Sequence, residues 1–385
     1  MKKIYICSKI NVMIARKIER QILKDFRKKK VLVILGARQV GKTTLLSQIN
    51  QEGKKVLSLN CDNADDRLLL ENRTTTELSQ LLSSYDLAFI DEAQRVANIG
   101  ITIKMIGDLK LDTQVIVTGS SSFDIANRVN EPATGRTIEY KLYPFSMREL
   151  ADYSSQREEH RLLGNRLIYG MYPEVVMEPA DAKRTLVSLA NNYLYKDLLS
   201  YKGIKKPELL QNLVKALALQ LGSEVSYNEL GNMLGVDKET VENYIDLLEK
   251  CFVVFRLSSF SRNMRNEIKK GKKIYFYDNG IRNAVISNFA PIEMRTDAGA
   301  LWENFIISER VKRNSYMGSY AQLYFWRTHD QSEVDLIEEE DGLLHTFEFK
   351  WNPLRKAKLS QAFAKAYPNS TFQLVTPENY WDFIG

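Results

Sequence analysis

Cysteine and histidine are scarce in this sequence, whose 385 residues include three of each. Cys7, Cys61 and Cys251 are far apart and odd in number, which argues against a disulfide framework and against a zinc knuckle. The histidines are equally scattered: His160, His329 and His345. Neither a disulfide-stapled domain nor a cysteine-based metal site is therefore indicated.

Long apolar segments are also absent. No apolar run approaches the roughly 20 residues that are needed to cross a bilayer. The stretch Ile4–Cys7 is too short for the core of a signal peptide, and Lys9 interrupts it. We therefore expect a cytoplasmic protein with no membrane partner. Residues 1–12 are expected to form an N-terminal lead, because Met13 fits as an initiator as well as Met1 does.

Charge of one sign is concentrated in two places, although the net charge of +6 is mild. Residues 1–30 hold eleven Lys or Arg against Glu19 and Asp25, and a second basic stretch runs from Arg256 to Lys273. Such stretches form either solvated faces or grooves for nucleic acid. A hydrophobic content of 44% and a charged content of 26% are ordinary for a globular chain, and the length suggests two or three domains.

A glycine-rich motif follows the apolar run Val31–Leu35 directly and leads into a segment with a helical pattern. Glycines let the backbone bend around a polyphosphate, and the helix N-terminus adds a positive dipole. Lys42 can then reach the β- and γ-phosphates and act in catalysis, while the Thr43 hydroxyl can ligate Mg²⁺. The motif predicts a site for ATP and Mg²⁺ made by Gly36, Ala37, Arg38, Gln39, Val40, Gly41, Lys42, Thr43 and Thr44.

An acidic pair, Asp91 and Glu92, ends the apolar run 87–90. An acid at the end of a strand beside the phosphate loop can hold the water shell of Mg²⁺, which suits Asp91. The adjacent Glu92 is placed to act as general base toward the attacking water. A nucleotide kinase does not need this second carboxylate, so the pair favours hydrolysis. Similar runs at 56–59, 115–118 and 138–142 alternate with helical patterns and predict a three-layer α/β domain with a largely parallel sheet.

Two further polar positions are candidates for the same site. The run 115–118 leads into a serine-rich segment, where Ser120 or Ser121 would lie between the water and the γ-phosphate as a sensor; a plain turn is the alternative. Arg136 precedes the last strand and is predicted to reach a γ-phosphate of its own chain or of a neighbouring subunit in a homo-oligomer. A structural salt bridge is an equal alternative for Arg136.

These motifs together resemble a family of prokaryotic AAA-like ATPases that carry a C-terminal half of uncharacterised function. The resemblance rests on the motifs at 36–46, 89–94, 118–122 and 135–150, and in the second half on those at 169–176, 191–197, 275–280 and 302–306. It covers nearly the whole chain from about Met13, and the order of the motifs is more specific than any one of them. The resemblance implies ATP binding and hydrolysis and supplies no settled biological role.

The middle of the chain shows a winged-helix pattern. Ser226 and Glu229 form a capping-box signature, Gly235 turns the chain, and Asp237 caps a second helix before an apolar strand at 251–257. The second helix is predominantly acidic, and acids facing a DNA groove would be repelled by phosphates. Asn243 is its one typical base-reading residue. Both a protein-packing role and a DNA contact therefore remain open.

The last hundred residues return to an α/β pattern. A strand over 343–351 places Glu348 and Lys350 on one face, and Asp335 on the neighbouring strand can come beside them. With Glu303 on the preceding helix, this set resembles the PD-(D/E)XK nuclease arrangement, in which carboxylates hold Mg²⁺ and a lysine helps to activate water. Val334 stands where a proline often precedes the aspartate. The sequence thus predicts a possible second metal site at Glu303, Asp335, Glu348 and Lys350.

We predict an α/β chain of three parts after the lead: an AAA-like ATPase domain at 13–150, a helical winged-helix domain at 151–273, and a restriction-endonuclease-like α/β domain at 274–385. The expected function is Mg²⁺-dependent ATP binding and hydrolysis coupled to the handling of DNA or RNA. One alternative is an ATP-gated protein-interaction switch with an inactive nuclease-like domain. The other is an ATP-dependent DNA nuclease.

Overall fold

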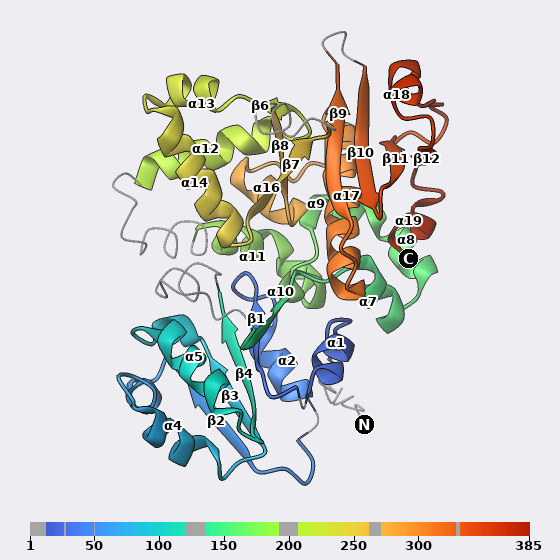
Figure 1. The fold of residues 1–385 in the computed structure, drawn as a ribbon. Helices are drawn as coiled ribbons and strands as arrows, with labels where there is room; N and C mark the ends of the chain where they lie inside the picture. The colour runs from blue at the N-terminus through green and yellow to red at the C-terminus, as the bar shows by residue number, and fades with distance from the viewer. Residues whose placement is uncertain are drawn as a thin grey trace, which may run out of the picture.

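The computed structural model describes residues 13–26, 28–49, 51–120, 135–191, 207–261, 271–328 and 332–385. The N-terminal lead at 1–12, the alternative sensor Ser121, most of the motif at 191–197 and the basic positions from Arg262 to Lys270 lie outside these residues. Within them, no helix is long and apolar enough to cross a membrane. Figure 1 shows two bodies of structure, one below the other. The strand β5 (Thr137–Lys141) belongs to the sheet of the lower body, and the helix α17 (Ala298–Met317) belongs to the upper body.

The N-terminal body is built on a five-stranded sheet in the order β2-β3-β4-β1-β5, with every pair parallel. Its strands are β1 (Val31–Leu35), β2 (Val56–Asn60), β3 (Leu87–Asp91), β4 (Gln114–Gly119) and β5. All residues of β1, β3 and β4 are buried, as expected for the central strands of a sheet that is covered on both faces. The predicted alternation of strands and helices is confirmed for this body.

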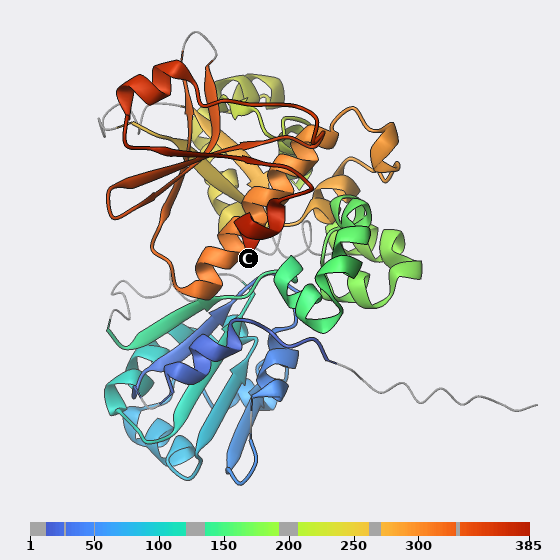
Figure 2. The same ribbon diagram turned by 90° about the vertical axis from the view of Figure 1, so that its right-hand side faces the viewer.

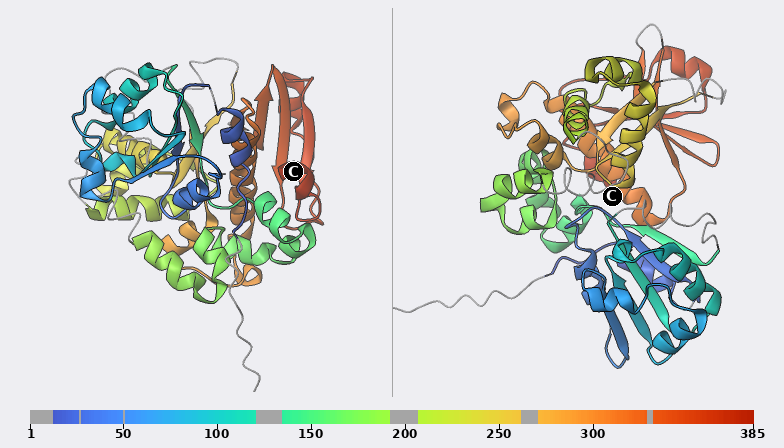
Figure 3. Two further views of the ribbon diagram at one scale, coloured as in Figure 1. Left: turned by 90° about the horizontal axis from the view of Figure 1, so that it is seen from below. Right: turned by 90° about the vertical axis from the view of Figure 1, so that its left-hand side faces the viewer.

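The helices of this body cover both faces of the sheet because its crossovers run in two directions. From β1 the chain passes through α2 (Lys42–Gln48) to β2 in one direction, and from β3 it returns through α5 (Ile99–Leu109) to β4 in the other. Right-handed crossovers in opposite directions place α2 and α5 on opposite faces, as Figure 3 shows. The remaining helices are α1 (Glu19–Lys24), α3 (Ala64–Leu68) and α4 (Thr75–Leu82).

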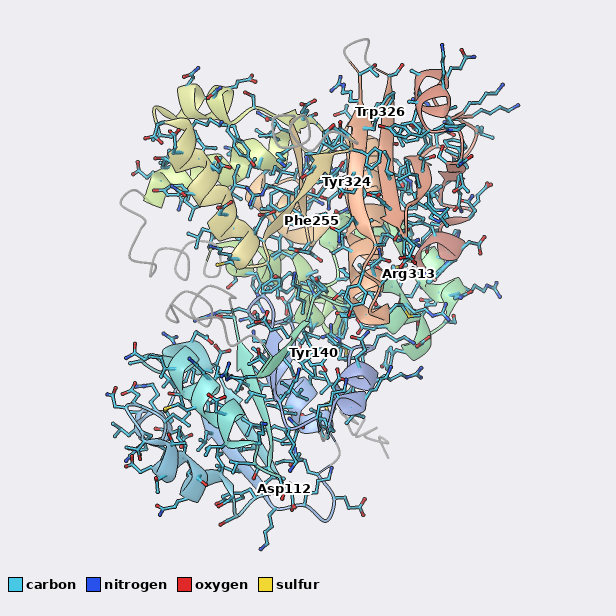
Figure 4. All side chains as sticks on the ribbon, in the orientation of Figure 1. Asp112, Tyr140, Phe255, Arg313, Tyr324 and Trp326 are labelled. Atoms are coloured by element: carbon cyan, nitrogen blue, oxygen red, sulfur yellow. The ribbon has the colours of Figure 1, made fainter. Side chains whose placement is uncertain are left out.

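A group of helices connects the two bodies. It consists of α7 (Met147–Tyr153), α8 (Gln156–Arg161), α9 (Leu163–Tyr169), α10 (Pro173–Met177) and α11 (Ala182–Leu189). Figure 2 shows them beside the junction, in green. A cavity of about 330 Å³ lies between β5 and α17, and Tyr140 on its wall is labelled at this junction in Figure 4.

The upper body begins with α12 (Pro207–Leu219), α13 (Tyr227–Leu234) and α14 (Lys238–Lys250). The caps predicted from sequence are formed: the Ser226 hydroxyl accepts from the N–H of Glu229 at 3.3 Å, and Asp237 accepts from the N–H of Thr240 at 2.6 Å. Between α13 and α14, Gly235 has φ +69°, a left-handed conformation that glycine adopts without strain. The strands β6 (Glu224–Val225), β7 (Val254–Ser259) and β8 (Lys272–Phe276) form an antiparallel set in the order β6-β8-β7.

This small sheet continues without a break into the C-terminal part. The seven-stranded sheet has the order β12-β11-β10-β9-β7-β8-β6, in which β7 pairs in parallel with β9 (Gln322–Arg327). The other strands are β10 (Glu333–Glu340), β11 (Leu343–Phe349) and β12 (Thr371–Val375), and α16 (Asn279–Val285), α17, α18 (Gln361–Ala366) and α19 (Tyr380–Ile384) complete the element set. The predicted boundary between residues 273 and 274 falls inside β8, so the middle and last predicted domains share one sheet.

Candidate nucleotide-binding site

The phosphate loop joins β1, which ends at Leu35, to α2, which begins at Lys42. Gln39 and Gly41 have φ of +59° and +93°, and these left-handed positions let the backbone turn back on itself. Gly36 lies so close to the chain after β5 that a Cβ atom there would be 2.2 Å from the carbonyl oxygen of Leu142. The glycine spacing read from the sequence therefore has a local steric reason at both ends of the loop.

Lys42 lies across this loop, and only 4% of it is exposed. Its Nζ donates to the carbonyl oxygens of Gly36 and Ala37, each at 3.0 Å. The ammonium group is thus held at the inner side of the loop by two backbone acceptors.

Thr43 and Asp91 meet at the carboxyl edge of the sheet. The Thr43 hydroxyl donates to Oδ2 of Asp91 at 2.6 Å, and the Thr118 hydroxyl donates to Oδ1 of the same carboxylate. Asp91 and Thr118 lie at the carboxyl ends of β3 and β4, and Thr43 is in α2, the helix that the phosphate loop joins to the carboxyl end of β1. Because β3, β4 and β1 are neighbours and parallel, these three ends lie at one edge of the sheet. A hydroxyl and a carboxylate are oxygen ligands of the kind that Mg²⁺ prefers, so the residues present fit this ion.

Glu92 follows Asp91 in a left-handed conformation with φ +52°. Its N–H donates to Oδ1 of Asp91 at 3.1 Å and to the Thr118 hydroxyl at 3.2 Å. Its side chain accepts from the amide of Gln94, whose Nε2 also donates to the Ser120 hydroxyl at 3.0 Å. The structure thus brings Glu92 and Ser120 together through Gln94. Gln94 is within the motif at 89–94 but was not predicted as a site residue; its position two residues after Glu92 is the signal that could have identified it.

Among the predicted residues of this site that the structure describes, Arg136 lies away from the phosphate loop. It precedes β5 at the amino edge of the sheet, where its carbonyl accepts from the N–H of Val31 at 3.0 Å and its guanidinium pairs with Asp108. The phosphate loop is at the opposite edge, the length of β1 away, about 3.3 Å per residue. A reach to the γ-phosphate of its own chain is therefore excluded by the sheet, and the structural salt bridge is present.

Arg16, which belongs to the basic stretch at residues 1–30, contacts the phosphate loop although no motif predicted it there. It is 5% exposed, and its guanidinium donates to the carbonyl of Val40 in the phosphate loop at 2.7 Å, to Glu149 at 3.0 Å and to the carbonyl of Tyr143 at 2.6 Å. A weaker contact at 3.4 Å joins it to the hydroxyl of Tyr316 on α17. Glu149 raises the pKa of Arg16 against the lowering effect of burial.

The predicted second metal site forms a cluster of mixed charge. The Nζ of Lys273 on β8 lies 3.2 Å from Glu303 on α17 and 2.5 Å from Glu333 on β10, and the Tyr275 hydroxyl donates to Glu303 at 2.6 Å. Burial alone would lower the pKa of Lys273, but the carboxylates of Glu303 and Glu333 outweigh it and raise this pKa. Burial raises the pKa of Glu303 to about 7; Lys273 opposes the rise and Asp335 adds to it.

Asp335 and Glu348 complete this cluster beside Lys350. The register of β10 against β9 shifts between Val334 and Ile337, and within this irregularity Asp335 turns to accept from the N–H of Phe349 at 2.8 Å. The Nζ of Lys350 lies 2.9 Å from Glu348 and 3.7 Å from Asp335. Burial, reinforced by Asp335, raises the pKa of Glu348 to about 7.

Two ammonium groups thus stand among the carboxylates: that of Lys350, which the prediction included, and that of Lys273, which it did not. Over the residues that the structure describes, no group of three or more His, Cys, Asp or Glu side chains is arranged to hold a metal ion. Lys350 is itself a cation and serves as the partner of Glu348. The four predicted residues are therefore brought together, and their binding of a metal ion stays a prediction.

A parallel sheet with a phosphate loop after β1 and an acid at the end of the next-but-one strand defines an AAA-like P-loop fold. Comparison with known proteins agrees: residues 28–151 match the family model of an AAA domain. Residues 160–291 and 298–379 match the models of two domains of unknown function, DUF8612 and DUF4143.

The chain is also similar to whole proteins. An uncharacterised protein of Haemophilus influenzae is 26% identical over 339 residues, which cover 82% of this chain and 81% of that protein. An uncharacterised protein of Methanocaldococcus jannaschii is 23% identical over 386 residues, covering 92% and 83%. Among solved structures, a Walker-type ATPase of Pyrococcus abyssi aligns with a TM-score of 0.51 at 14% identity, over 71% of this chain and 96% of that one. This last likeness concerns the fold alone.

Proposed function

We propose that this chain binds ATP with Mg²⁺ at the phosphate loop and hydrolyses it. The observation that carries the proposal is the bond between Thr43 and Asp91 at the edge of the sheet, with Glu92 held directly beside it. Thr43 and Asp91 would hold Mg²⁺, which neutralises phosphate charge. Lys42 would exchange its two carbonyl partners for the β- and γ-phosphates, and Ser120 would contact the γ-phosphate.

The role of Glu92 is that of general base. Its carboxylate stands next to Asp91, the aspartate proposed to hold Mg²⁺. Gln94 binds only its Oε2, so the other oxygen can accept a proton from the attacking water. A positioned base contributes about 10²- to 10⁴-fold to a rate. Arg136 would reach a γ-phosphate only in a neighbouring subunit, so a role for Arg136 in hydrolysis would require a homo-oligomer.

For the C-terminal half, a gated interaction module is favoured over a nuclease. The elements α12, α13, α14 and the β6-β8-β7 set support a winged helix, but α14 exposes Glu239 and Glu242. Arg256, which would contact phosphates, is instead paired with Asp246 and Glu249. Lys273, which is not part of the nuclease arrangement, pairs with Glu303. Together these pairs support the gated interaction module, which binds a partner without cutting nucleic acid.

The first experiment measures phosphate release from ATP and Mg²⁺ by the purified chain, with and without DNA. Wild-type protein is expected to release phosphate. Glu92→Gln is expected to bind ATP but to release phosphate at least about 100-fold more slowly, because the base is lost while the contacts with the phosphates of ATP remain. Lys42→Ala is expected to lose binding as well.

The DNA in the same reactions reports on the second half. Intact DNA and a rate that DNA does not change would support the gated interaction module. A rate of phosphate release that DNA increases in wild type but not in Glu92→Gln would identify nucleic acid as the partner. Metal-dependent cutting that disappears in Asp335→Ala would establish the nuclease instead.

A further inference from the structure

Gln94 occupies a position between two groups that the proposed reaction needs. Asp91 ends β3 and Ser120 follows β4, and these two strands are direct neighbours. Gln94 lies in a single 3₁₀ turn, Ala93–Arg95, that follows Glu92 and packs against β4. Its side chain therefore spans from the end of one strand to the end of the next, over the edge where the phosphate loop opens.

Each polar atom of the Gln94 amide has a partner at this edge. Nε2 donates one proton to Oε2 of Glu92 and the other to the Ser120 hydroxyl at 3.0 Å, and Oε1 accepts from the N–H of Ser120 at 3.4 Å. The two donations fix which end of the amide faces Glu92, because a carboxylate accepts and does not donate. Within the part of the chain that the structure describes, no hydrogen bond reaches the second carboxylate oxygen of Glu92.

We infer that Gln94 is a positioning residue that fixes the general base Glu92 and the sensor Ser120 relative to each other. This inference rests on the proposed function. By binding Oε2, the amide leaves Oε1 of Glu92 to accept the proton of the attacking water. By binding Ser120 on both its N–H and its hydroxyl, the amide couples the orientation of that carboxylate to the strand end that faces the γ-phosphate. A γ-phosphate that accepts a hydrogen bond from the Ser120 hydroxyl then changes the orientation of the Glu92 carboxylate through the amide of Gln94.

The test is ATP hydrolysis by Gln94→Ala and Gln94→Glu. Both variants are expected to lower kcat about 10- to 100-fold while the Kd for ATP changes less than about threefold, because the phosphate contacts of the loop are untouched. Gln94→Glu keeps the shape of the side chain but replaces the donating amide with a carboxylate beside Glu92. If Gln94 only filled space, Gln94→Glu would leave kcat unchanged. Any effect of a substitution would then fall on stability rather than on kcat alone.

A double-mutant cycle with Ser120→Ala tests the coupling. Because part of the effect of Ser120 passes through the Gln94 amide, the loss of kcat in the double variant Gln94→Ala/Ser120→Ala is expected to be smaller than the product of the two single losses. Arg95→Ala is the matched control: Arg95 is the next residue but points to Asp62, 3.1 Å away, and it should keep the wild-type kcat.

The outcomes separate this inference from the proposed function. Wild-type hydrolysis that Glu92→Gln abolishes but Gln94→Glu leaves unchanged would overturn the inference and keep the ATPase. Additive effects in the cycle would also overturn it. A wild-type chain that binds ATP without hydrolysing it would remove both.

Discussion

Single side chains in the C-terminal cluster make stability depend on pH. Glu303 has its pKa raised to about 7 by burial, with Asp335 adding to the rise, and burial likewise raises the pKa of Glu348 to about 7. A carboxyl whose pKa is higher in the folded chain binds more protons there than in the unfolded chain. Folding is therefore favoured by these groups at low pH, and the benefit is lost as pH rises from about 4.5 to about 7.

Glu303→Gln should reduce this loss, because an amide cannot ionise. We expect the melting temperature of the variant, relative to wild type, to rise between pH 5 and pH 8, by on the order of a few °C. Thermal unfolding at the two pH values measures it. Glu293→Gln, on the η4 turn Ile292–Met294 and outside the cluster, is the control and should show no such trend. A constant difference between Glu303→Gln and wild type would contradict the expectation.

At the scale of elements, the turn from β1 into α2 depends on one glycine. A Cβ on Gly36 would lie 2.2 Å from the backbone oxygen of Leu142, whose N–H bonds the carbonyl of Leu35 at 2.7 Å. Backbone cannot rotate aside as a side chain can, so Gly36→Ala must displace the phosphate loop. We expect a cost of about 1–3 kcal/mol and a clear loss of ATP affinity, measured by thermal unfolding and nucleotide titration.

Gly299→Ala provides the matched control on another element. This glycine is in α17, and a Cβ there would have nothing within 4 Å. The change should stabilise the chain by about 0.5–1 kcal/mol, because alanine loses less backbone freedom in a helix. Equal effects of the two substitutions would show that the close approach at Gly36 does not matter.

The elements that the sequence predicted well are those with strong local signals. The strand before Gly36, the strand ending at Asp91 and the caps at Ser226 and Asp237 follow from apolar runs and turn residues, and each is present within a residue or two. What local patterns could not supply is pairing between distant segments. That β7 joins β9 in one sheet, and that Lys273 meets Glu303 and Glu333, depends on contacts across 30 or more residues.

The same limit explains the misplaced and missed site residues. Arg136 was read by its position before a strand, but only the parallel sheet shows that the start of β5 lies opposite the phosphate loop. Gln94 and Arg16 bind partners that are distant in the sequence, Ser120 and Val40. No spacing along the chain predicts these contacts. Ser120, by contrast, was predicted from its place after an apolar run, and that run is the strand β4, which neighbours β3.

At the scale of the whole molecule, Arg16 is where the two bodies and the phosphate loop meet. The segment between β5 and α7, together with the first turn of α7, is held from one side by Arg16, through the carbonyl of Tyr143 and the side chain of Glu149. From the other side α17 holds it: Glu309 accepts from the N–H of Met147 at 2.7 Å, and Lys312 donates to the carbonyl of Phe145 at 3.0 Å. The far part of the same helix carries Glu303, so α17 connects the junction to the charged cluster.

Arg16→Met should therefore affect both bodies at once. It leaves the buried Glu149 without its ion partner, which costs about 3–5 kcal/mol, and it removes the donor to Val40, so ATP affinity should also fall. Arg20→Met, an exposed change on the helix α1 that follows Arg16, should stay within about 0.5 kcal/mol of wild type. Hydrogen exchange with and without a non-hydrolysable ATP analogue adds the decisive reading. In wild type and Arg20→Met, the analogue should increase protection along α17, because the loop, Arg16 and Tyr316 are in contact. In Arg16→Met at saturating analogue that increase should be absent, and an equal increase in all three proteins would show that the nucleotide site and α17 are not coupled through Arg16.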